Sequence, residues 1–386
     1  MPNANVRTDV VVIGCGIVGA SSAWHLAQRG LRVVVLEAQA GPAEGSTGRS
    51  FSSVRAQWAD PLNIEISWTS IQRYRDFPQH HGVDLGYRPT GYLLLVPEAG
   101  WERHLRAVAL QRSFGVPVEV LDPRAASRRT PFDANGIAGA TWGPTDGVVD
   151  PQRATTAFLA LAKDRGAEVL FRTPVTAIER QGSEGGWTVV AGDRRIFTRY
   201  VVNAAGGWSD ALAALAGLRV PVVHSRRNIY ATAPDPTTGP YPMTIDTGTG
   251  AFLRSEGPRL LFGAVRPNEP AGYNVTVDWE WLEMLLPTMV ERWPWFADLG
   301  LDRAACWAGT YELTPDHQPI VGPDATAPTF IHACGFSGHG VMQAPEIGRL
   351  VAEQVVEGAI TSVDARPFGL ERFGKSADRG DLAMVF

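Results

Sequence analysis

The sequence predicts an α/β fold in which a doubly wound, mostly parallel sheet binds a nucleotide and a second domain is inserted in pieces. An apolar strand, a glycine-rich turn, a helix and a second apolar strand follow one another within residues 9–36, the pattern of one βαβ unit. Apolar strands of the same kind recur at residues 200–204 and 329–333. Shorter strand-like runs, interrupted by proline and glycine, lie between them. We therefore expect a discontiguous nucleotide-binding domain at residues 1–85, 141–215 and 306–386. A second, substrate-binding domain is expected at residues 86–140 and 216–305.

The size and composition exclude several kinds of partner. The chain has 386 residues, 19% of them charged, and a net charge of −5, so it can bury a large core but offers no basic surface for nucleic acid or anionic lipid. No apolar run approaches the about 20 residues that a membrane helix requires, and residues 1–9 lack the apolar core of a secretory signal. The three cysteines, Cys15, Cys306 and Cys334, are far apart and show no zinc-type spacing. We expect a cytoplasmic protein without a metal site.

The N-terminal part of the chain alternates strand and helix. Residues 9–13 (DVVVI) and 32–36 (RVVVL) are short apolar runs typical of buried parallel strands. Residues 17–28 carry small and apolar side chains at helical spacing, and Gly30 ends this helix. A loop rich in Gly, Ser and Thr and a further helix are expected next, at residues 41–53 and 63–77.

The remaining elements follow from the same periodicities. We expect helices at residues 150–166, 278–293 and 345–356. We expect strands at residues 91–96, 168–171, 187–190, 228–232 and 259–262. A glycine-rich turn at 334–340 stands between the strand at 329–333 and the last helix, so the end of the chain repeats the strand, turn and helix of its beginning.

The first turn has the pattern of a dinucleotide site. Residues 14–19 (GCGIVG) match GxGxxG, lie between a strand and a helix, and are followed by a second strand that ends in Glu37. Gly14 permits the tight turn, Gly16 lets the backbone approach a pyrophosphate, and Gly19 lets the helix pack on the strand. The helix N-terminus offers N–H groups and a positive dipole end to the phosphates. Glu37 is placed to accept hydrogen bonds from the adenosine ribose.

Two further features favour FAD over NAD as the dinucleotide. Residues 45–50 (GSTGRS) supply hydroxyl and amide groups for an extended cofactor soon after the second strand. Residues 335–340 (GFSGHG) present backbone N–H groups and a helix N-terminus to a second polar group. A flavin requires such a dipole because its reduced ring is negatively charged around N1 and C2=O.

Five motifs in order resemble the D-amino-acid-oxidase superfamily of FAD-dependent oxidoreductases. They are DVVVIGCGIVGASSAWHLAQRG with VVVLEA, GSTGRSFSSVR, VVNAAGGWSD, WAGTYELTPDHQPIVG and GFSGHGVMQAPEIGRLVAE. The chain is most similar to the branch that contains sarcosine oxidase, glycine oxidase, D-arginine dehydrogenase and the proline dehydrogenase β-subunit.

The resemblance implies a fold and an activity. In the fold, FAD extends through the first domain and an antiparallel sheet of the α+β second domain covers one face of its ring. The activity is oxidation of a secondary, N-methyl, cyclic or D-amino acid, or of another amine, by hydride transfer to flavin N5, after which the imine hydrolyses. Electrons then pass to O2 or another acceptor, and a partner subunit is an open alternative.

The resemblance also assigns residues to the cofactor. They are Gly14, Gly16, Ile17, Val18, Gly19, Glu37, Ala38, Ser46, Thr47, Arg49, Ser50, Val175, Ala205, Gly206, Trp208, Gly309, Gly335, Gly338, His339, Gly340, Val341 and Met342. His339 is also a weak alternative for a catalytic base, because oxidation by hydride transfer needs a neutral amine rather than a strong base.

The substrate positions depart from those of the relatives. Arg55 matches the carboxylate-binding arginine of sarcosine oxidase, but Met342 stands where that enzyme has a lysine. Glycine oxidase and D-arginine dehydrogenase have an arginine where this chain has Tyr311. Arg227 matches a substrate-site position of D-arginine dehydrogenase, and a guanidinium suits a carboxylate. The expected walls of the pocket include further aromatic and apolar side chains: Trp58, Tyr230, Tyr311 and Met342.

Two other departures concern oxygen and flavin linkage. Leu261 occupies the position of the lysine that assists oxygen reaction in sarcosine oxidase, which favours a dehydrogenase or a slow oxidase. Gly309, and not Cys306, stands at the position of the linking cysteine, so we expect non-covalent FAD and a Cys306 buried by packing. Alternatives that remain open are a β-subunit of a multi-subunit dehydrogenase, a flavin monooxygenase, for which a second GxGxxG motif is missing, and a non-catalytic FAD-binding protein.

Overall fold

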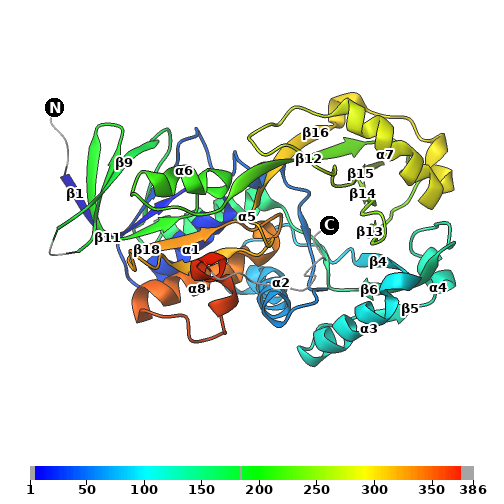
Figure 1. The fold of residues 1–386 in the computed structure, drawn as a ribbon, viewed down its shortest axis with the longest axis horizontal. Coiled ribbons are helices and arrows are strands. Elements are labelled where there is room, and N and C mark those ends of the chain that lie inside the picture. Colours follow the sequence, from blue (N-terminus) through cyan, green and yellow to red (C-terminus); the bar gives the residue numbers. More distant parts are fainter. Residues whose placement is uncertain (1–4, 183–184, 375–386) are drawn as a thin grey trace.

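The computed structural model describes residues 5–182 and 185–374 and builds them around two eight-stranded sheets. Figure 1 shows the two sheets at opposite ends of the long axis of the molecule. The first sheet has the order β17-β18-β11-β1-β2-β8, with β10 and β9 attached beside β11. All its neighbours from β18 to β8 are parallel, which confirms the expected doubly wound sheet. Its strands are β1 (Asn5–Ile13), β2 (Val33–Leu36), β8 (Glu168–Leu170), β9 (Val175–Arg180), β10 (Trp187–Ala191), β11 (Arg194–Asn203), β17 (Ile320–Pro323) and β18 (Phe330–Cys334).

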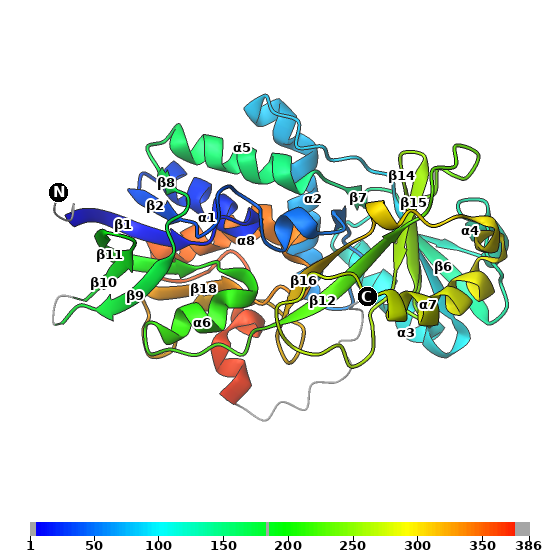
Figure 2. The same cartoon turned by 90° about the horizontal axis from the view of Figure 1, so that it is seen from above.

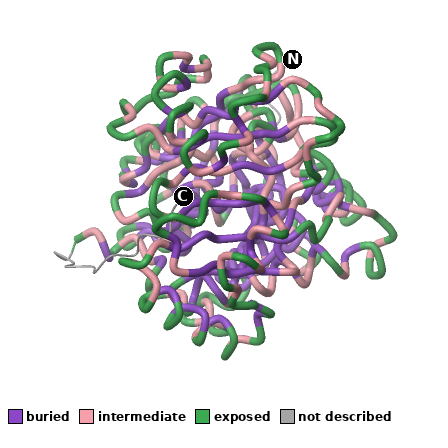
Figure 3. Tube along the Cα trace, turned by 90° about the vertical axis from the view of Figure 1, so that its right-hand side faces the viewer, coloured by how far each residue is buried: buried purple, intermediate pink, exposed green. Residues whose placement is uncertain are grey.

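Side-chain alternation places two layers on the first sheet. Val10 and Val12 of β1 pack into a core shared with the helices of one face. Val11 and Ile13 point to the other face, into a second core, as the two-residue period of a strand requires. Among the helices that contribute to the first core are α1 (Ile17–Gln28), α2 (Pro61–His81), α5 (Pro151–Lys163) and α8 (Gly340–Glu357). Helix α6 (Ser209–Ala214) contributes to the second core. Figure 3 shows the buried residues, in purple, running through the interior of the molecule.

The second sheet is mostly antiparallel and has the order β16-β12-β15-β14-β13-β4-β6-β5. Its strands are β4 (Tyr92–Pro97), β5 (Glu119–Leu121), β6 (Ile137–Gly143), β12 (Val223–Ala231), β13 (Met243–Asp246), β14 (Phe252–Glu256), β15 (Arg259–Gly263) and β16 (Trp307–Leu313). It is accompanied by α3 (Glu98–Ser113), α4 (Pro123–Ser127) and α7 (Trp279–Arg292). A two-stranded ladder joins β3 (Ser53–Val54) to β7 (Gly147–Val148). Figure 2 shows β12 and β16 reaching from this sheet toward the first.

Two of the expected domain boundaries fall at or beside strands of the second sheet. The boundary expected at 141 falls inside β6, and the one expected at 306 precedes β16, yet both strands pair within the second sheet. The division of the chain into two domains stays a prediction.

Two elements differ from the sequence-based expectations. Helix α3 lies where only strands and turns were expected, and α8 begins at Gly340 and not at residue 345. Pro345 has no N–H to donate to the carbonyl of Val341. That carbonyl instead accepts a hydrogen bond of 2.6 Å from the Tyr74 hydroxyl of α2, so a tertiary contact lets the helix extend through the proline.

Candidate functional site

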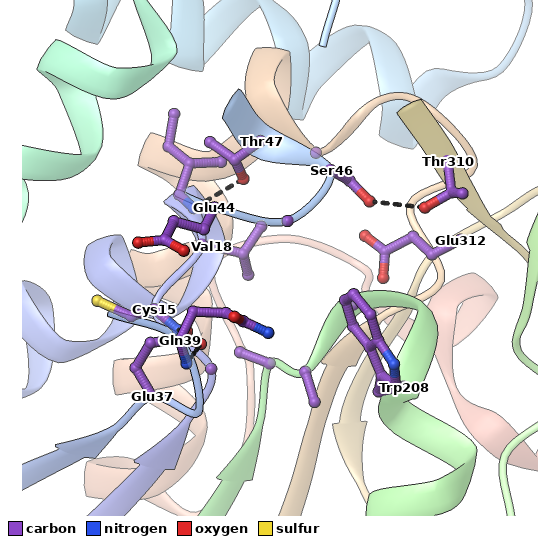
Figure 4. A pocket seen from close by; sticks show the side chains of 18 of the residues that line it. Cys15, Val18, Glu37, Gln39, Glu44, Ser46, Thr47, Trp208, Thr310 and Glu312 are labelled. Carbon is purple, nitrogen blue, oxygen red and sulfur yellow. Dashed lines mark hydrogen bonds between the residues drawn. The ribbon is translucent and has the colours of Figure 1, made fainter. Parts of the chain in front are cut away.

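A cavity of about 670 Å³ lies between the carboxyl ends of the first sheet and strands β12 and β16. This is where open α/β sheets bind ligands. Figure 4 shows side chains pointing into it from several elements. Most of the residues expected to hold the cofactor line it: Gly14, Gly16, Ile17, Val18, Glu37, Ala38, Ser46, Thr47, Arg49, Ser50, Val175, Ala205, Gly206, Trp208, Gly309, Gly338, Gly340 and Val341.

The glycine turn brings bare backbone to this cavity. Gly14 has a φ of +102°, and a Cβ there would lie 2.3 Å from the Ala204 carbonyl oxygen. Gly16 precedes the first residue of α1 and has no side chain to cap the helix, so the helix N-terminus faces the cavity. Gly19 does not line the cavity; a Cβ there would lie 2.0 Å from the Gly14 carbonyl. Gly19 thus serves the packing of α1 on the turn, as expected from the motif.

Glu37 lines the cavity and also accepts a hydrogen bond from the backbone of the glycine turn. Its Oε2 accepts a hydrogen bond of 2.7 Å from the Cys15 N–H, and its Oε1 accepts one of 2.8 Å from the Gln39 N–H. A carboxylate has about four acceptor sites, so sites remain for the hydroxyl groups of a ribose.

The loop after β2 is joined to both the turn and the second sheet. The Thr47 hydroxyl accepts from the Ile17 N–H at 3.2 Å, and the hydroxyls of Ser46 and Thr310 lie 3.4 Å apart. The carbonyl of Arg49 accepts from the Trp307 Nε1–H at 3.0 Å. The loop therefore forms a continuous wall from α1 to β16.

A second helix N-terminus faces the same cavity. Gly340 and Val341 begin α8, and the residue before the helix, His339, makes no capping hydrogen bond with its side chain. The N-termini of two helices thus meet one cavity, which fits a ligand that is negative or electron-rich at two separate places. Gly335 lies outside this lining; its N–H donates to the Glu312 carboxylate at 3.0 Å.

A smaller cavity of about 70 Å³ adjoins the first. Arg227 and Tyr311 line both cavities. Arg55, His339 and Met342 line only the smaller one. Its remaining wall is largely apolar, with Phe51, Ile229, Met243, Ile245, Phe252, Ala264 and Val265.

Arg227 is half-buried and has one buried, unsatisfied donor. Its Nη1 donates to the Ser225 hydroxyl and to the Arg226 carbonyl, both at 2.8 Å. Its Nε has no hydrogen-bond partner among the described residues. Burial lowers the pKa of its guanidinium. A cation removed from water in this way is stabilised by an anionic partner.

Arg55 is held by the segment that follows it. Arg55 is 3% exposed, and its guanidinium lies 3.8 Å from the centre of the Trp58 ring. Asp146 accepts from the Ala56 N–H at 2.9 Å and from the Gln57 amide at 3.0 Å. Burial raises the pKa of Asp146 to about 6. Asp146 was not predicted from the sequence as a site residue. The only sequence feature that could have indicated it is its place in a turn next to the strand that pairs with the Arg55 segment.

Two residues expected to wall the substrate pocket reach neither cavity. The Trp58 ring packs against the Arg55 guanidinium, and the centres of the Trp58 and His339 rings are 4.3 Å apart. Tyr230 follows Ile229 on β12, so strand alternation turns its ring to the opposite face. There it packs in the core of the second sheet and donates to the Asp278 carbonyl.

Two further candidate residues are His339, which is buried and lines the smaller cavity, and Cys306. Burial and the charge of Arg55 hold the pKa of His339 well below 6.5, so its imidazole is neutral. Cys306 is half-buried rather than buried, and its Sγ accepts from the Ala231 N–H at 3.3 Å and donates to the Asp302 carbonyl at 3.2 Å. It lines neither cavity.

Within residues 5–182 and 185–374, His, Cys, Asp and Glu side chains form no group of three that suits a metal ion. Within the same residues, no helix has the length and apolar character needed to cross a membrane.

Comparison with known proteins agrees with this geometry. The DAO family, described as FAD dependent oxidoreductase, matches residues 9–354. FAD-dependent oxidoreductase domain-containing protein 1 of Bos taurus is 31% identical over 95% of this chain and 85% of its own length. Mitochondrial sarcosine dehydrogenase of Homo sapiens is 27% identical, and the match covers 95% of this chain but 42% of that protein. The crystal structure of L-proline dehydrogenase from P. horikoshii has a TM-score of 0.88 at 31% identity and covers 96% of this chain and 99% of its own.

Proposed function

Because the chain belongs to the DAO family of FAD dependent oxidoreductases, we propose that it oxidises the C–N bond of a small amine that carries a carboxylate. The observation that supports this substrate class is Arg227, which lines both cavities and whose Nε has no hydrogen-bond partner among the described residues. The secondary, N-methyl, cyclic and D-amino acids all belong to this class.

The larger cavity fits FAD. The turn at Gly14 and Gly16 and the N-terminus of α1 would hold the pyrophosphate, with Glu37 and Val175 at the adenosine end. Residues Arg49, Gly309, Gly338, Gly340 and Val341 would face the ring. When bound, FAD accepts the hydride equivalent from the carbon next to the substrate nitrogen. We propose that the cofactor is not covalently attached, since Cys306 lies outside both cavities.

The smaller cavity would orient the substrate. Arg227 and Arg55 supply guanidinium groups that suit a carboxylate, and Tyr311 stacks on Arg227 with 4.7 Å between the guanidinium carbon and the ring centre. The two cations also disfavour an ammonium group in the same cavity, which lowers the pKa of a bound amine. The protein thus favours the neutral amine that can be oxidised. The cavity of about 70 Å³ and its apolar wall favour a small substrate.

The electron acceptor is proposed from the environment of Leu261. This residue is buried beside Ile229 and Ala231, and among the described residues no lysine lines either cavity. We propose a dehydrogenase that passes electrons to an acceptor other than O2, with a partner subunit as one such acceptor. Cytoplasmic location is also a proposal, and the human sarcosine dehydrogenase similar to this chain is named as mitochondrial.

The experiment that tests the function is anaerobic mixing of the yellow holoprotein with amines. A panel of N-methyl, cyclic and primary amino acids is compared with the matching amines that lack the carboxylate, while the flavin absorbance is followed. Bleaching by amino acids, and weaker bleaching by their decarboxylated counterparts, is the expected result. Bleaching by NADPH with no response to any amine would point to a monooxygenase and refute the proposal. Turnover by the isolated chain would count against the subunit alternative.

A further inference from the structure

Glu312 is a half-buried residue in the wall of the larger cavity, and the proposed reaction assigns no role to its carboxyl group. It follows Tyr311 on β16, and its carboxyl group points into the cavity between Trp208 and Thr310 (Figure 4). The glycine turn, with Cys15 and Glu37, lies across the cavity from it.

The protein stabilises this carboxylate only in part. The backbone N–H groups of Gly335 and Phe336 are directed at it, with Gly335 N at 3.0 Å from Oε2. Among the described residues it forms no ion pair, and burial raises its pKa to about 7. A carboxylate has about four acceptor sites, so two N–H groups leave acceptor capacity on the side that faces the cavity. Burying a charge that lacks such partners is costly.

The charge of Glu312 restricts which part of a dinucleotide can lie beside it. A phosphate next to a carboxylate in a buried site would be strongly repelled. The phosphates have a favourable place elsewhere, at the N-terminus of α1. The ring end is bounded by Gly309 and Tyr311 on the same strand and by the start of α8. The segment that remains is the chain between phosphate and ring, which in FAD is a ribityl polyol whose hydroxyl groups are neutral hydrogen-bond donors.

We propose that Glu312 is a cofactor-binding residue that accepts a hydrogen bond from a ribityl hydroxyl of FAD. The contact supplies a further donor on the side of the carboxylate that faces the cavity, and it sets the position of the polyol chain between the two helix N-termini. Hydrogen bonds to charged acceptors are about twice as strong as neutral ones, so this contact contributes to cofactor affinity. The inference depends on FAD binding and not on the substrate proposed above.

The test measures binding of FAD and of its 2′-, 3′- and 4′-deoxyribityl analogues to the apoprotein at pH 8.5, by quenching of flavin fluorescence. The wild-type apoprotein should bind one of the analogues about ten- to a hundredfold more weakly than FAD, since a hydrogen bond to a charged group is lost. In Glu312→Ala this discrimination should disappear. In Glu312→Gln, which keeps the shape and an acceptor for the Gly335 N–H, it should fall to a few-fold.

Glu280→Gln provides the control, because the Glu280 side chain is 77% exposed, and it should discriminate as the wild type does. Thermal unfolding of each apoprotein reports whether the variant folds. The proposal is overturned if the wild type binds all three analogues as tightly as FAD. It is also overturned if Glu312→Ala and Glu312→Gln weaken FAD and every analogue by one common factor, since Glu312 would then only support the loop at Gly335.

Discussion

The guanidinium carbon of Arg227 lies 4.7 Å from the centre of the Tyr311 ring. Both side chains line the two adjoining cavities. The ring holds the guanidinium on one face, and the Nε of Arg227 has no protein acceptor among the described residues. This pair connects the strand β12 to the strand β16 at the point where substrate and cofactor would meet.

Replacement of Arg227 should separate carboxylated from uncarboxylated substrates. In Arg227→Met we expect KM for the best amino acid to rise about ten- to a hundredfold, because a charge-assisted hydrogen bond is lost. The rate constant for flavin reduction by the matching decarboxylated amine should hardly change. Arg219→Ala, at a 79% exposed side chain, is the control. Equal effects on both substrates would show that Arg227 does not bind the carboxylate.

Asp146 should act on the substrate through Arg55. Its carboxylate holds both residues that follow Arg55, so Asp146→Asn should raise KM for the amino acid a few-fold and leave kcat nearly unchanged. Arg55→Ala should raise KM more strongly. Steady-state kinetics on both variants checks the order of these effects, and an unchanged KM in Arg55→Ala would remove Arg55 from the substrate site.

The same carboxyl group should give stability a pH dependence. Burial raises the pKa of Asp146 to about 6 in the folded protein, against about 3.9 in an unfolded chain. Charging the group therefore costs the folded state stability as pH rises from about 4 to about 6, and the full cost persists above that. The free energy of unfolding of Asp146→Asn minus that of the wild type should become more positive by up to about 3 kcal/mol between pH 4 and pH 7.

Urea unfolding of the apoproteins at several pH values measures this difference. Subtraction of the wild type removes the contributions of other groups, such as the buried histidines His25 and His104, whose lowered pKa values act in the opposite direction. Asp193→Asn, at an exposed turn residue, should show no such trend. A difference for Asp146→Asn that stays constant with pH would contradict the prediction.

The glycine turn should tolerate no side chain at its first position. In Gly14→Ala the new Cβ would meet the Ala204 carbonyl oxygen at 2.3 Å, at a φ of +102°. We expect the purified variant to lack FAD and to gain no thermal stability when FAD is added. Gly30→Ala is a matched control, since its φ is +81° but no atom lies within 4 Å of its Cβ position. It should lose about 1 kcal/mol of stability and keep FAD; retention of FAD by Gly14→Ala would refute the assignment of the turn.

Acid precipitation should release all the flavin. Cys306 donates to the Asp302 carbonyl and lines neither cavity, and Gly309 cannot form a thioether. The denatured protein should be colourless and have the mass of the bare chain, and Cys306→Ala should bind FAD as the wild type does. A protein mass increased by one FAD, lost in Cys306→Ala, would show a covalent link.

Local sequence patterns were sufficient to predict the secondary structure around the glycine turn. The strands around residues 10–12 and 33–36, the turn at Gly14 and the helix after it depend on neighbours in the chain, and the structure shows all of them. The start of α8 was misplaced because the partner of the Val341 carbonyl is Tyr74, 267 positions away. Helix α3 was missed because its buried face is short, with only His104, Ala107, Val108 and Gln111 buried.

The sequence by itself determined the dinucleotide turn, the glycine-rich turn at 335–340 and the family, because each depends on contiguous residues with a fixed geometry. Only the tertiary structure decided which polar residues share a cavity. Arg227 faces the site and Tyr230 the core because β12 alternates its faces. Asp146 and Glu312 become important because segments distant in the chain bury them together with Arg55 and with the cavity wall. Burial and convergence are properties of the fold, and no local pattern encodes them.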